Sequence, residues 1–155
     1  MIRPATAADA PALHDLLCGL AAHDGTRTPG GIASLLEHGF GPTPLFRALV
    51  AEDAGTGQGM VLYYPCYSTL RGKPGLHIED LFVRPAARGQ GLGRALVVAA
   101  VQQADWQPVF VTLGVDPENH SAHRFYASLG FKRRGYDLLL LDGPALTDPA
   151  LKALK

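Results

Sequence analysis

Residues 75–103 constrain the fold of this chain more strongly than any other segment. The run GLHIEDLFV (75–83) is apolar enough for a central strand, and RGQGLGRAL (88–96) then places three glycines at alternate positions between two arginines. From Leu92 onward, apolar residues recur at helical spacing and valines fill much of the remaining surface, which is typical of a helix buried against a sheet. The segment therefore predicts a strand, a glycine loop and a helix in immediate succession.

Shorter elements of both kinds surround this segment. Apolar runs with β-branched residues predict strands at 1–4, 45–53, 59–67 and 108–115, with Pro65 weakening the end of the third. Apolar residues at helical spacing predict helices at 9–20, 32–39 and 121–130. Residues 131–142 are expected to add one or two strands, and residues 145–155 a helical turn or a frayed end. This order predicts an α/β fold on a mostly antiparallel sheet with a parallel pair in its middle.

The composition favours one globular domain over residues 1–155. With 47% apolar residues the chain can bury a core without disulfides, and Cys18 and Cys66 are expected to be free thiols. The 14 basic and 14 acidic residues cancel, so no overall positive field exists for nucleic acid or an anionic membrane. The start, MIRPATAADAP, lacks the apolar segment of a signal peptide, and no apolar run approaches the roughly 18 residues of a spanning helix. We therefore expect a cytoplasmic protein.

The glycine loop is suited to holding an anion. The first N–H groups of the helix that follows have no intrahelical partners, and the helix dipole adds a partial positive charge. Residues without a Cβ let a pyrophosphate approach these groups, and Arg88 and Arg94 add charge from the sides. The spacing differs from that of a P-loop and from that of a dinucleotide-binding loop. A flexible glycine-rich turn without a ligand is the alternative interpretation.

Two motifs carry a resemblance to a known family. The pattern Arg88-x-x-Gly91-x-Gly93, after a strand ending in DLFVRP, resembles the acetyl-CoA-binding motif of the GNAT-type N-acetyltransferases. The stretch VDPENHSAHRFYASLGF (115–131) resembles a later motif of the same family. The resemblance implies a mixed, mostly antiparallel sheet of about six to seven strands flanked by about four helices. It further implies a central parallel strand pair splayed around the cofactor, acetyl-CoA as the co-substrate, and a homodimer.

The resemblance also implies which residues bind the cofactor. A backbone N–H around Phe82 or Val83 would stabilise the oxyanion, and the same strand edge would pair with the pantetheine arm. Asn119 has two interpretations, a hydrogen bond to the cofactor arm or a helix cap, and Ser121 competes for the cap. The residues expected at the cofactor are Leu81, Phe82, Val83, Arg88, Gly89, Gln90, Gly91, Leu92, Gly93, Arg94, Asn119 and Tyr126.

Within the family, the chain looks most like the diamine acetyltransferases of the spermidine/spermine type and their relatives acting on small amines such as thialysine. The stretches IRPATAAD, LLEHGFGPTPLFRALVAE, IEDLFV and the YY pair at 63–64 carry this likeness. The chain departs from it at 66–72, where Ser68, Thr69 and Leu70 replace an acidic residue, a proline and a tryptophan. The loop at 25–31 also has no glutamates, so a long polycation would meet fewer carboxylates here.

Two residues are candidates for the proton transfers of acetyl transfer to an amine. An alkylammonium has a pKa of about 10.4, so a general base helps it to attack a thioester at neutral pH. Glu79, just before the glycine loop, is the candidate base and would act through a water, with a salt-bridged strand residue as the alternative. Tyr126, by its place in the later motif, is the candidate acid for the departing thiolate, although most helical tyrosines only pack.

The acceptor is expected to meet an acidic cluster. Asp24, Glu79 and Asp80 would attract a cationic substrate, and Tyr63 and Tyr64 would line its path. In a regular strand Asp80 would face away from Glu79, whereas a β-bulge would change that alternation.

The sequence thus predicts an enzyme that transfers acetyl from acetyl-CoA to a primary amine of a polyamine, a diamine or a lysine-like molecule, by direct attack in a ternary complex. The alternatives are a protein or peptide N-acetyltransferase, which would need an open groove, and a non-catalytic acyl-CoA sensor, which would not need both Glu79 and Tyr126. No metal is expected, because His120 and His123 lack a carboxylate or thiol partner. The role of His77 is unassigned.

Overall fold

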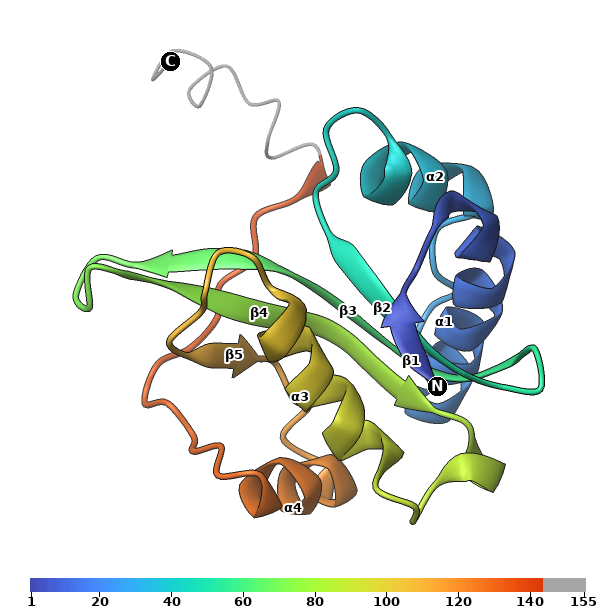
Figure 1. The fold of residues 1–155 in the computed structure, drawn as a ribbon. Helices are drawn as coiled ribbons and strands as arrows, with labels where there is room; N and C mark the ends of the chain where they lie inside the picture. The colour runs from blue at the N-terminus through green and yellow to red at the C-terminus, as the bar shows by residue number, and fades with distance from the viewer. Residues whose placement is uncertain (144–155) are drawn as a thin grey trace. The chain divides into compact units, whose positions relative to one another are not determined.

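The long hairpin of β3 (Thr56–Ser68) and β4 (Lys73–Val83) dominates the sheet of this computed structural model, which describes residues 1–143. The strand order is β1-β2-β3-β4-β5, and every neighbouring pair is antiparallel except β4 and β5, which are parallel (Figure 1). The shorter strands are β1 (Ile2–Pro4), β2 (Arg47–Asp53) and β5 (Val111–Leu113).

Two compact units make up the chain. Residues 1–118 hold the five described strands, and the second unit begins at Asn119 and contains α4 (His120–Ser128). The helical elements of the first unit are η1 (Ala7–Asp9), α1 (Ala10–Asp24), α2 (Ile32–Phe40), η2 (Pro85–Ala87) and α3 (Leu92–Gln103). None of the helices in residues 1–143 is long and apolar enough to cross a membrane.

Helices cover both faces of the sheet in the first unit (Figure 1). Leu13 and Leu16 of α1 are fully buried in a core that also contains Val50 and Met60 of the sheet. α3 packs on the opposite face, where the Leu96 side chain lies beside Gly59 of β3. Because both faces of the central strands are buried, these strands are apolar at consecutive positions rather than alternating with polar residues.

The β2–β3 hairpin is tighter than its glycine-rich sequence predicts. Asp53 pairs with Thr56, so Ala54 and Gly55 alone form the turn, and their φ angles are 47° and 76°. Positive φ at both positions is the conformation of the two-residue turns that match the twist of a hairpin. The strands expected at 45–53 and 59–67 leave five residues between them, whereas the structure leaves only these two in the turn.

Two element ends also differ from the expectation. β3 continues through Pro65, because β2 begins opposite Tyr63 and the rest of β3 has β4 as its neighbour on one side only. A proline is tolerated on such an edge, where no ladder hydrogen bond is lost. α2 does not end at Gly39 but continues to Phe40, with Gly41 as its C-cap.

The sheet has fewer strands than the six to seven expected, since the described residues form five. Residues 131–143 contain no strand, and the leucines at 138–141 within the segment DLLLLD are 54% to 94% exposed. With no described strand beyond β5, the parallel pair of β4 and β5 lies at the edge of the sheet and not in its middle. The expectation for residues 145–155 lies outside the described residues.

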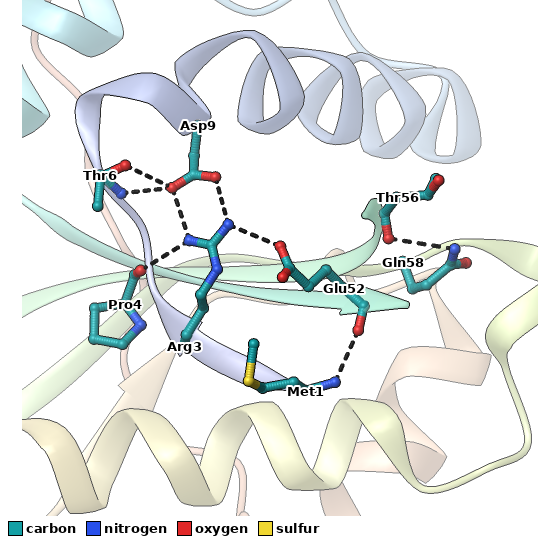
Figure 2. A network of polar contacts seen from close by, with 8 residues as sticks. All are labelled: Met1, Arg3, Pro4, Thr6, Asp9, Glu52, Thr56 and Gln58. Atoms are coloured by element: carbon teal, nitrogen blue, oxygen red, sulfur yellow. Dashed lines mark hydrogen bonds and ion pairs between the residues drawn. The ribbon is translucent and has the colours of Figure 1, made fainter. Parts of the chain in front are cut away.

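An ion-pair network joins β1, the start of α1 and β2 (Figure 2). Arg3 donates to the two carboxylate oxygens of Asp9 at 2.9 and 2.8 Å and to Glu52 at 2.8 Å, and the Thr6 N–H donates to Asp9 at 2.7 Å. Asp9 holds the N-cap position of α1 as expected, but its side chain makes these contacts instead of capping that helix. The hydrogen bonds from Arg3 hold the pKa of Asp9 well below its ordinary value.

Candidate active site

β4 carries a β-bulge at the centre of the candidate site. Leu62 pairs with Asp80, whereas the next residue, Tyr63, pairs with Ile78, so Glu79 is an extra residue without a partner on β3. In an unbroken ladder Glu79 would lie opposite Tyr63. The bulge instead lets Glu79 and Asp80 line the same pocket on the face covered by α1 and α2. Of the two orientations that the sequence left open for Asp80, the structure contains the one that a bulge produces.

This pocket has a volume of about 630 Å³ and lies among α1, α2, the loop between them and the sheet. Asp24, at the C-terminal end of α1, joins Glu79 and Asp80 in its lining, so the three acidic residues expected at the acceptor lie around one pocket. Arg27, from the loop, adds one guanidinium to the same lining. The volume is within the range of pockets for small molecules. Apolar lining comes from Leu17, Leu20, Leu35 and Leu62.

The carboxyl of Asp80 is harder to ionise than that of an exposed aspartate. Burial raises its pKa from 3.8 to about 6, and the negative charges of Glu79 and Asp24 act in the same direction. Asp80 is therefore charged at neutral pH at a cost in free energy, which a cation bound in the pocket would reduce.

The carboxylate of Glu79 has two side-chain neighbours, Tyr64 on β3 and His77 on β4. The Tyr64 hydroxyl donates a hydrogen bond of 2.9 Å to Oε2 of Glu79, and Nε2 of His77 lies 3.8 Å from the same oxygen. Nδ1 of His77 lies 2.8 Å from Oγ1 of Thr112 on β5. Burial, followed by the hydrogen bond to Glu79, raises the pKa of Tyr64 to about 12, so the phenol remains a donor. Tyr64 thus reaches the candidate site through Glu79.

Tyr63, in contrast, does not lie on the path of the acceptor. Its side chain is 2% exposed and its ring centroid lies 6.2 Å from that of Trp106, which follows α3. Adjacent residues of a strand face opposite sides of the sheet, so Tyr63 and Tyr64 could not both line one pocket without a bulge between them. The expectation that Tyr63 lines the substrate path is wrong.

Beyond the bulge, one edge of β4 lies open among the described residues. β5 ends at Leu113, which pairs with Ile78, while β4 continues to Val83. The backbone groups of β4 that point away from β3 after Ile78 therefore have no neighbouring strand in the part of the chain that the structure describes. The expected splay of the parallel pair would begin at this point.

The direction of each N–H group along this edge follows from the ladder. Arg84 donates its N–H to Gln58 of β3 at 2.8 Å, and alternate residues of an antiparallel strand point the same way, so Phe82 also faces β3. Leu81 and Val83 accordingly direct their N–H groups toward the open edge. The Phe82 ring is 5% exposed and belongs to the core beneath α1. Of the expected cofactor-binding residues on β4, Leu81 and Val83 are the two that present N–H groups at this edge.

The glycine loop adopts a conformation that few other residues would accept. Gly89 and Gly91 both have a φ of 78°, and Gly91 is the N-cap of α3 without a side-chain hydrogen bond. The first intrahelical bond runs from the Ala95 N–H to the Gly91 carbonyl, so the N–H groups of residues 92–94 have no acceptor within the helix. A Cβ at Gly89 or Gly91 would meet no atom within 4 Å, so the surface beside these glycines is open to a ligand.

The side chains around the loop are mostly exposed. Arg88 donates from Nε to the Val83 carbonyl at 2.9 Å, which places its guanidinium 5.8 Å from the centroid of the Phe82 ring. Gln90 and Arg94 are exposed. Arg88 therefore connects the glycine loop to the open end of β4, where the expected pyrophosphate and pantetheine sites would meet.

The later motif lies in the second unit. Asn119 accepts a hydrogen bond from the Ala122 N–H at 3.0 Å and is the N-cap of α4, so the helix-cap interpretation holds and Ser121 is not the cap. Tyr126 lies on α4, half-buried, with its ring 5.0 Å from that of Phe125 and 5.5 Å from that of Phe131.

Sequence reasoning missed two parts of this site. Thr112 looks like an ordinary β-branched strand residue in the sequence. Only the parallel register of β4 and β5 brings it opposite His77. Arg27 lies in a loop whose sequence gives no indication of its distance from Glu79, which is far along the chain. A signal for the first was present, because His77 interrupts an apolar strand and a partly buried polar side chain favours a hydrogen-bond partner.

Comparisons with known proteins agree with this geometry. The Acetyltransferase (GNAT) family model matches residues 19–131. Thialysine N-epsilon-acetyltransferase of Bos taurus is 33% identical over 132 residues, which cover 77% of this chain and 77% of that protein. Spermidine/spermine N(1)-acetyltransferase-like protein 1 of Homo sapiens is 31% identical over 143 residues, which cover 83% of this chain and 20% of that protein.

Solved structures show the same fold. An integron cassette protein from the mobile metagenome of V. cholerae superimposes with a TM-score of 0.79 at 19% identity, covering 97% of this chain and 96% of that one. A probable acetyltransferase superimposes with a TM-score of 0.75 at 23% identity, covering 92% of this chain and 99% of that one. The chain is an acyltransferase and belongs to the acetyltransferase (GNAT) family.

Proposed function

We propose that this enzyme transfers the acetyl group of acetyl-CoA to a primary amine of a small molecule. The observation that carries this proposal is the pocket of about 630 Å³ in which three carboxylates gather next to the open edge of β4. Such a cluster attracts a cation, and an alkylammonium is the cationic form of the acceptor. The open edge of β4, and the glycine loop that follows this strand, would bind the acetyl donor.

The residues of the first unit fit acetyl-CoA as the co-substrate. Gly89 and Gly91 leave open space where a side chain would stand, and the N–H groups at the start of α3 have no helical acceptor. Arg88 and Arg94 add positive charge for phosphate oxygens. Leu81 and Val83 would hold the amide groups of the pantetheine arm at the open edge. When bound, acetyl-CoA supplies a thioester carbonyl as the electrophile.

The proposed proton path uses Glu79 as the base and Tyr126 as the acid. Glu79 takes a proton from the acceptor ammonium, directly or through a water, and the neutral amine attacks the thioester carbonyl. A C–N bond forms, the N–H of Val83 stabilises the negative charge that develops on the carbonyl oxygen, and the C–S bond breaks. Tyr126 then donates its phenolic proton to the departing thiolate, and the second proton that the new amide nitrogen loses restores the phenol through water, while Glu79 releases its proton to solvent.

The lining favours an acceptor that has a carboxylate as well as an amine. Arg27 would attract the carboxylate of a lysine-like amino acid, and it would repel the additional ammonium groups of a polyamine. The relative named for thialysine supports this choice. The relative named for spermidine and spermine supports polyamines as the second class.

A panel of acceptors tests the proposal. The purified protein is mixed with acetyl-CoA and, separately, with thialysine, lysine, ornithine, spermidine, putrescine or a lysine-containing peptide, and release of free thiol is followed. We expect turnover with the amino acids above turnover with the polyamines. Preference for the peptide would indicate a protein N-acetyltransferase. Binding of acetyl-CoA without turnover of any amine would indicate a sensor and would contradict the proposal.

The two units are proposed to act as one N-acetyltransferase domain in a homodimer. The family match runs through the boundary at residues 118 and 119, which supports a single domain. Sedimentation equilibrium of the purified protein measures the oligomeric state, and a mass of one chain at all concentrations would contradict the dimer.

A further inference from the structure

We propose that Tyr64 and His77, with Thr112 behind the histidine, are positioning residues that hold one oxygen of the Glu79 carboxylate and leave the other oxygen for the acceptor amine. This inference rests on the proposed function, in which Glu79 is the base. It gives three side chains of the sheet a role that the proposed cofactor site and the acidic pocket do not account for.

The contacts of Glu79 are one-sided. Among the described residues, both side chains that reach the carboxylate approach Oε2, Tyr64 with a hydrogen bond of 2.9 Å and His77 at 3.8 Å. The distance from His77 is too long for a direct hydrogen bond, but it is short enough for an electrostatic contact or a bridging water. Neither contact uses Oε1, and Glu79 is one of the residues that line the pocket.

The register of the sheet sets up this arrangement. Tyr64 pairs with His77, and His77 pairs with Thr112, so the three side chains form a row across β3, β4 and β5. The ring of Tyr64 lies against that of His77, with centroids 5.1 Å apart at 33°. The bulge at Glu79 then brings the carboxylate back over this row.

Thr112 can pair with the tautomer of His77 that suits a carboxylate, and the carboxylate of Glu79 favours that tautomer. Nδ1 of His77 lies 2.8 Å from the Thr112 hydroxyl, which can donate to it. With Nδ1 accepting, the proton of the neutral imidazole is on Nε2 and points toward Oε2 of Glu79. The opposite tautomer would set a nitrogen lone pair against the carboxylate, which is unfavourable.

Glu79 needs such support because its surroundings do not otherwise fix it. Its side chain is 53% exposed and stands on a bulge, so without partners it would sample several rotamers. A base is effective only when it is held within reach of the proton that it takes. The hydrogen bond from Tyr64 and the electrostatic or water-bridged contact from His77, both at Oε2, would restrict the carboxylate while leaving Oε1 available.

Kinetics of Tyr64→Phe, alone and combined with Glu79→Gln, test this coupling. We expect Tyr64→Phe to lower kcat about tenfold with the KM for acetyl-CoA unchanged, and to have no further effect in the Glu79→Gln background. Tyr67→Phe, on the exposed end of the same strand, is the matched control and should keep wild-type rates. An equal loss in both backgrounds, or wild-type kcat in Tyr64→Phe, would overturn the proposal.

Two substitutions of Thr112 separate the effect of its hydroxyl from the effect of its shape. Thr112→Val removes the hydroxyl and keeps the shape, whereas Thr112→Ser keeps the hydroxyl. We expect Thr112→Val to lower kcat several-fold and Thr112→Ser to keep most of it. If both variants lost the same activity, packing and not the hydroxyl would be responsible, and Thr112 would have no positioning role.

The tautomer of His77 provides a readout that does not depend on turnover. In protein labelled with ¹⁵N-histidine, the neutral ring of His77 should carry its proton on Nε2, and Thr112→Val should raise the population of the other tautomer. A proton on Nδ1 in the unsubstituted protein would overturn the proposed arrangement. Absence of turnover with every amine, together with the expected tautomer, would instead refute the proposed function and leave the side-chain row intact.

Discussion

Glu79 and Asp80 are adjacent in the chain, yet their carboxyl groups lie in different surroundings. The side chain of Glu79 is 53% exposed and accepts a hydrogen bond from Tyr64. Burial dominates at Asp80 and raises its pKa to about 6. Different surroundings of two neighbouring acids commonly separate their roles. Under the proposed function, these surroundings suit Glu79 to proton transfer and Asp80 to binding the cationic acceptor.

Replacing Asp80 with asparagine should stabilise the fold at high pH. The native pKa of Asp80, about 6, lies above its ordinary value of 3.8, so the native state binds this proton more tightly than the unfolded state. The charged carboxylate therefore costs stability above pH 6, and this cost disappears as the pH falls toward 3.8. We expect Asp80→Asn to raise the free energy of unfolding by about 1 to 2 kcal/mol at pH 8, with much of the pKa shift discounted for solvent screening.

Urea unfolding at pH 8 and at pH 4 measures this difference. The gain from Asp80→Asn should be large at pH 8 and small at pH 4. Asp53→Asn, at the exposed end of β2, is the control and should change little at either pH. A gain that is the same at both pH values would show that the charge of Asp80 is not its cause.

At the scale of elements, glycine in the loop before α3 could be needed for two reasons. It allows a positive φ, and it leaves room for the proposed ligand. Gly91 and Gly72 both have positive φ, 78° and 60°, and a Cβ at either would meet no atom within 4 Å. Alanine at each position should therefore cost a similar free energy of unfolding, about 1 kcal/mol. Only Gly91→Ala should also weaken binding of CoA, because only its Cβ would stand beside the free N–H groups of α3.

Calorimetric titration of CoA into both variants makes the comparison. Gly72 lies in the turn between β3 and β4, away from the glycine loop, so Gly72→Ala controls for backbone strain. Equal CoA affinity in the two variants and the unsubstituted protein would contradict the proposed phosphate site.

Elements in which apolar residues recur at a regular spacing were predictable from the sequence. The leucines of α1 recur at helical spacing, and the buried Leu13, Leu16 and Leu17 follow that spacing in the structure. The strand, glycine loop and helix at 75–103 are confirmed as β4, its following loop and α3. In both places the local pattern and the packing favour the same conformation.

Features set by pairing were not predictable. The bulge exists only relative to β3, since nothing within IEDLFV distinguishes an extra residue from a regular one. For the same reason the sequence could not choose between Phe82 and Val83 as the edge donor. The leucines of DLLLLD suggest a strand, but a strand also needs a partner, and residues 131–143 form none.

For the molecule as a whole, the network of Arg3, Asp9 and Glu52 ties the first strand to the rest of the first unit (Figure 2). The N-terminal amine adds a 2.8 Å hydrogen bond to the Glu52 carbonyl. Asp9→Asn should lower Tm at pH 7 by about 2 to 4 °C. Because Arg3 lowers the pKa of Asp9, this stabilisation is present above the ordinary value of 3.8 and is lost as the pH falls below it.

Thermal unfolding of Asp9→Asn at several pH values checks this expectation. The difference in Tm from the unsubstituted protein should narrow as the pH falls through the range in which Asp9 takes up a proton. Asp105→Asn removes a pair with Arg47 in which the aspartate is 72% exposed, and it should shift Tm less. A larger shift for Asp105→Asn would contradict the importance of the Arg3 network.

The bulge on β4 has a consequence in genetic terms. Since Ile78 pairs with Tyr63 and Asp80 with Leu62, loss of the single codon for Glu79 would join two segments that are already in register. The shortened strand would be regular, with Asp80 still in the pocket and the proposed base gone. If Glu79 is the base, a folded but inactive form of this enzyme is one in-frame deletion away, and an ordinary strand could have acquired the base by one in-frame insertion.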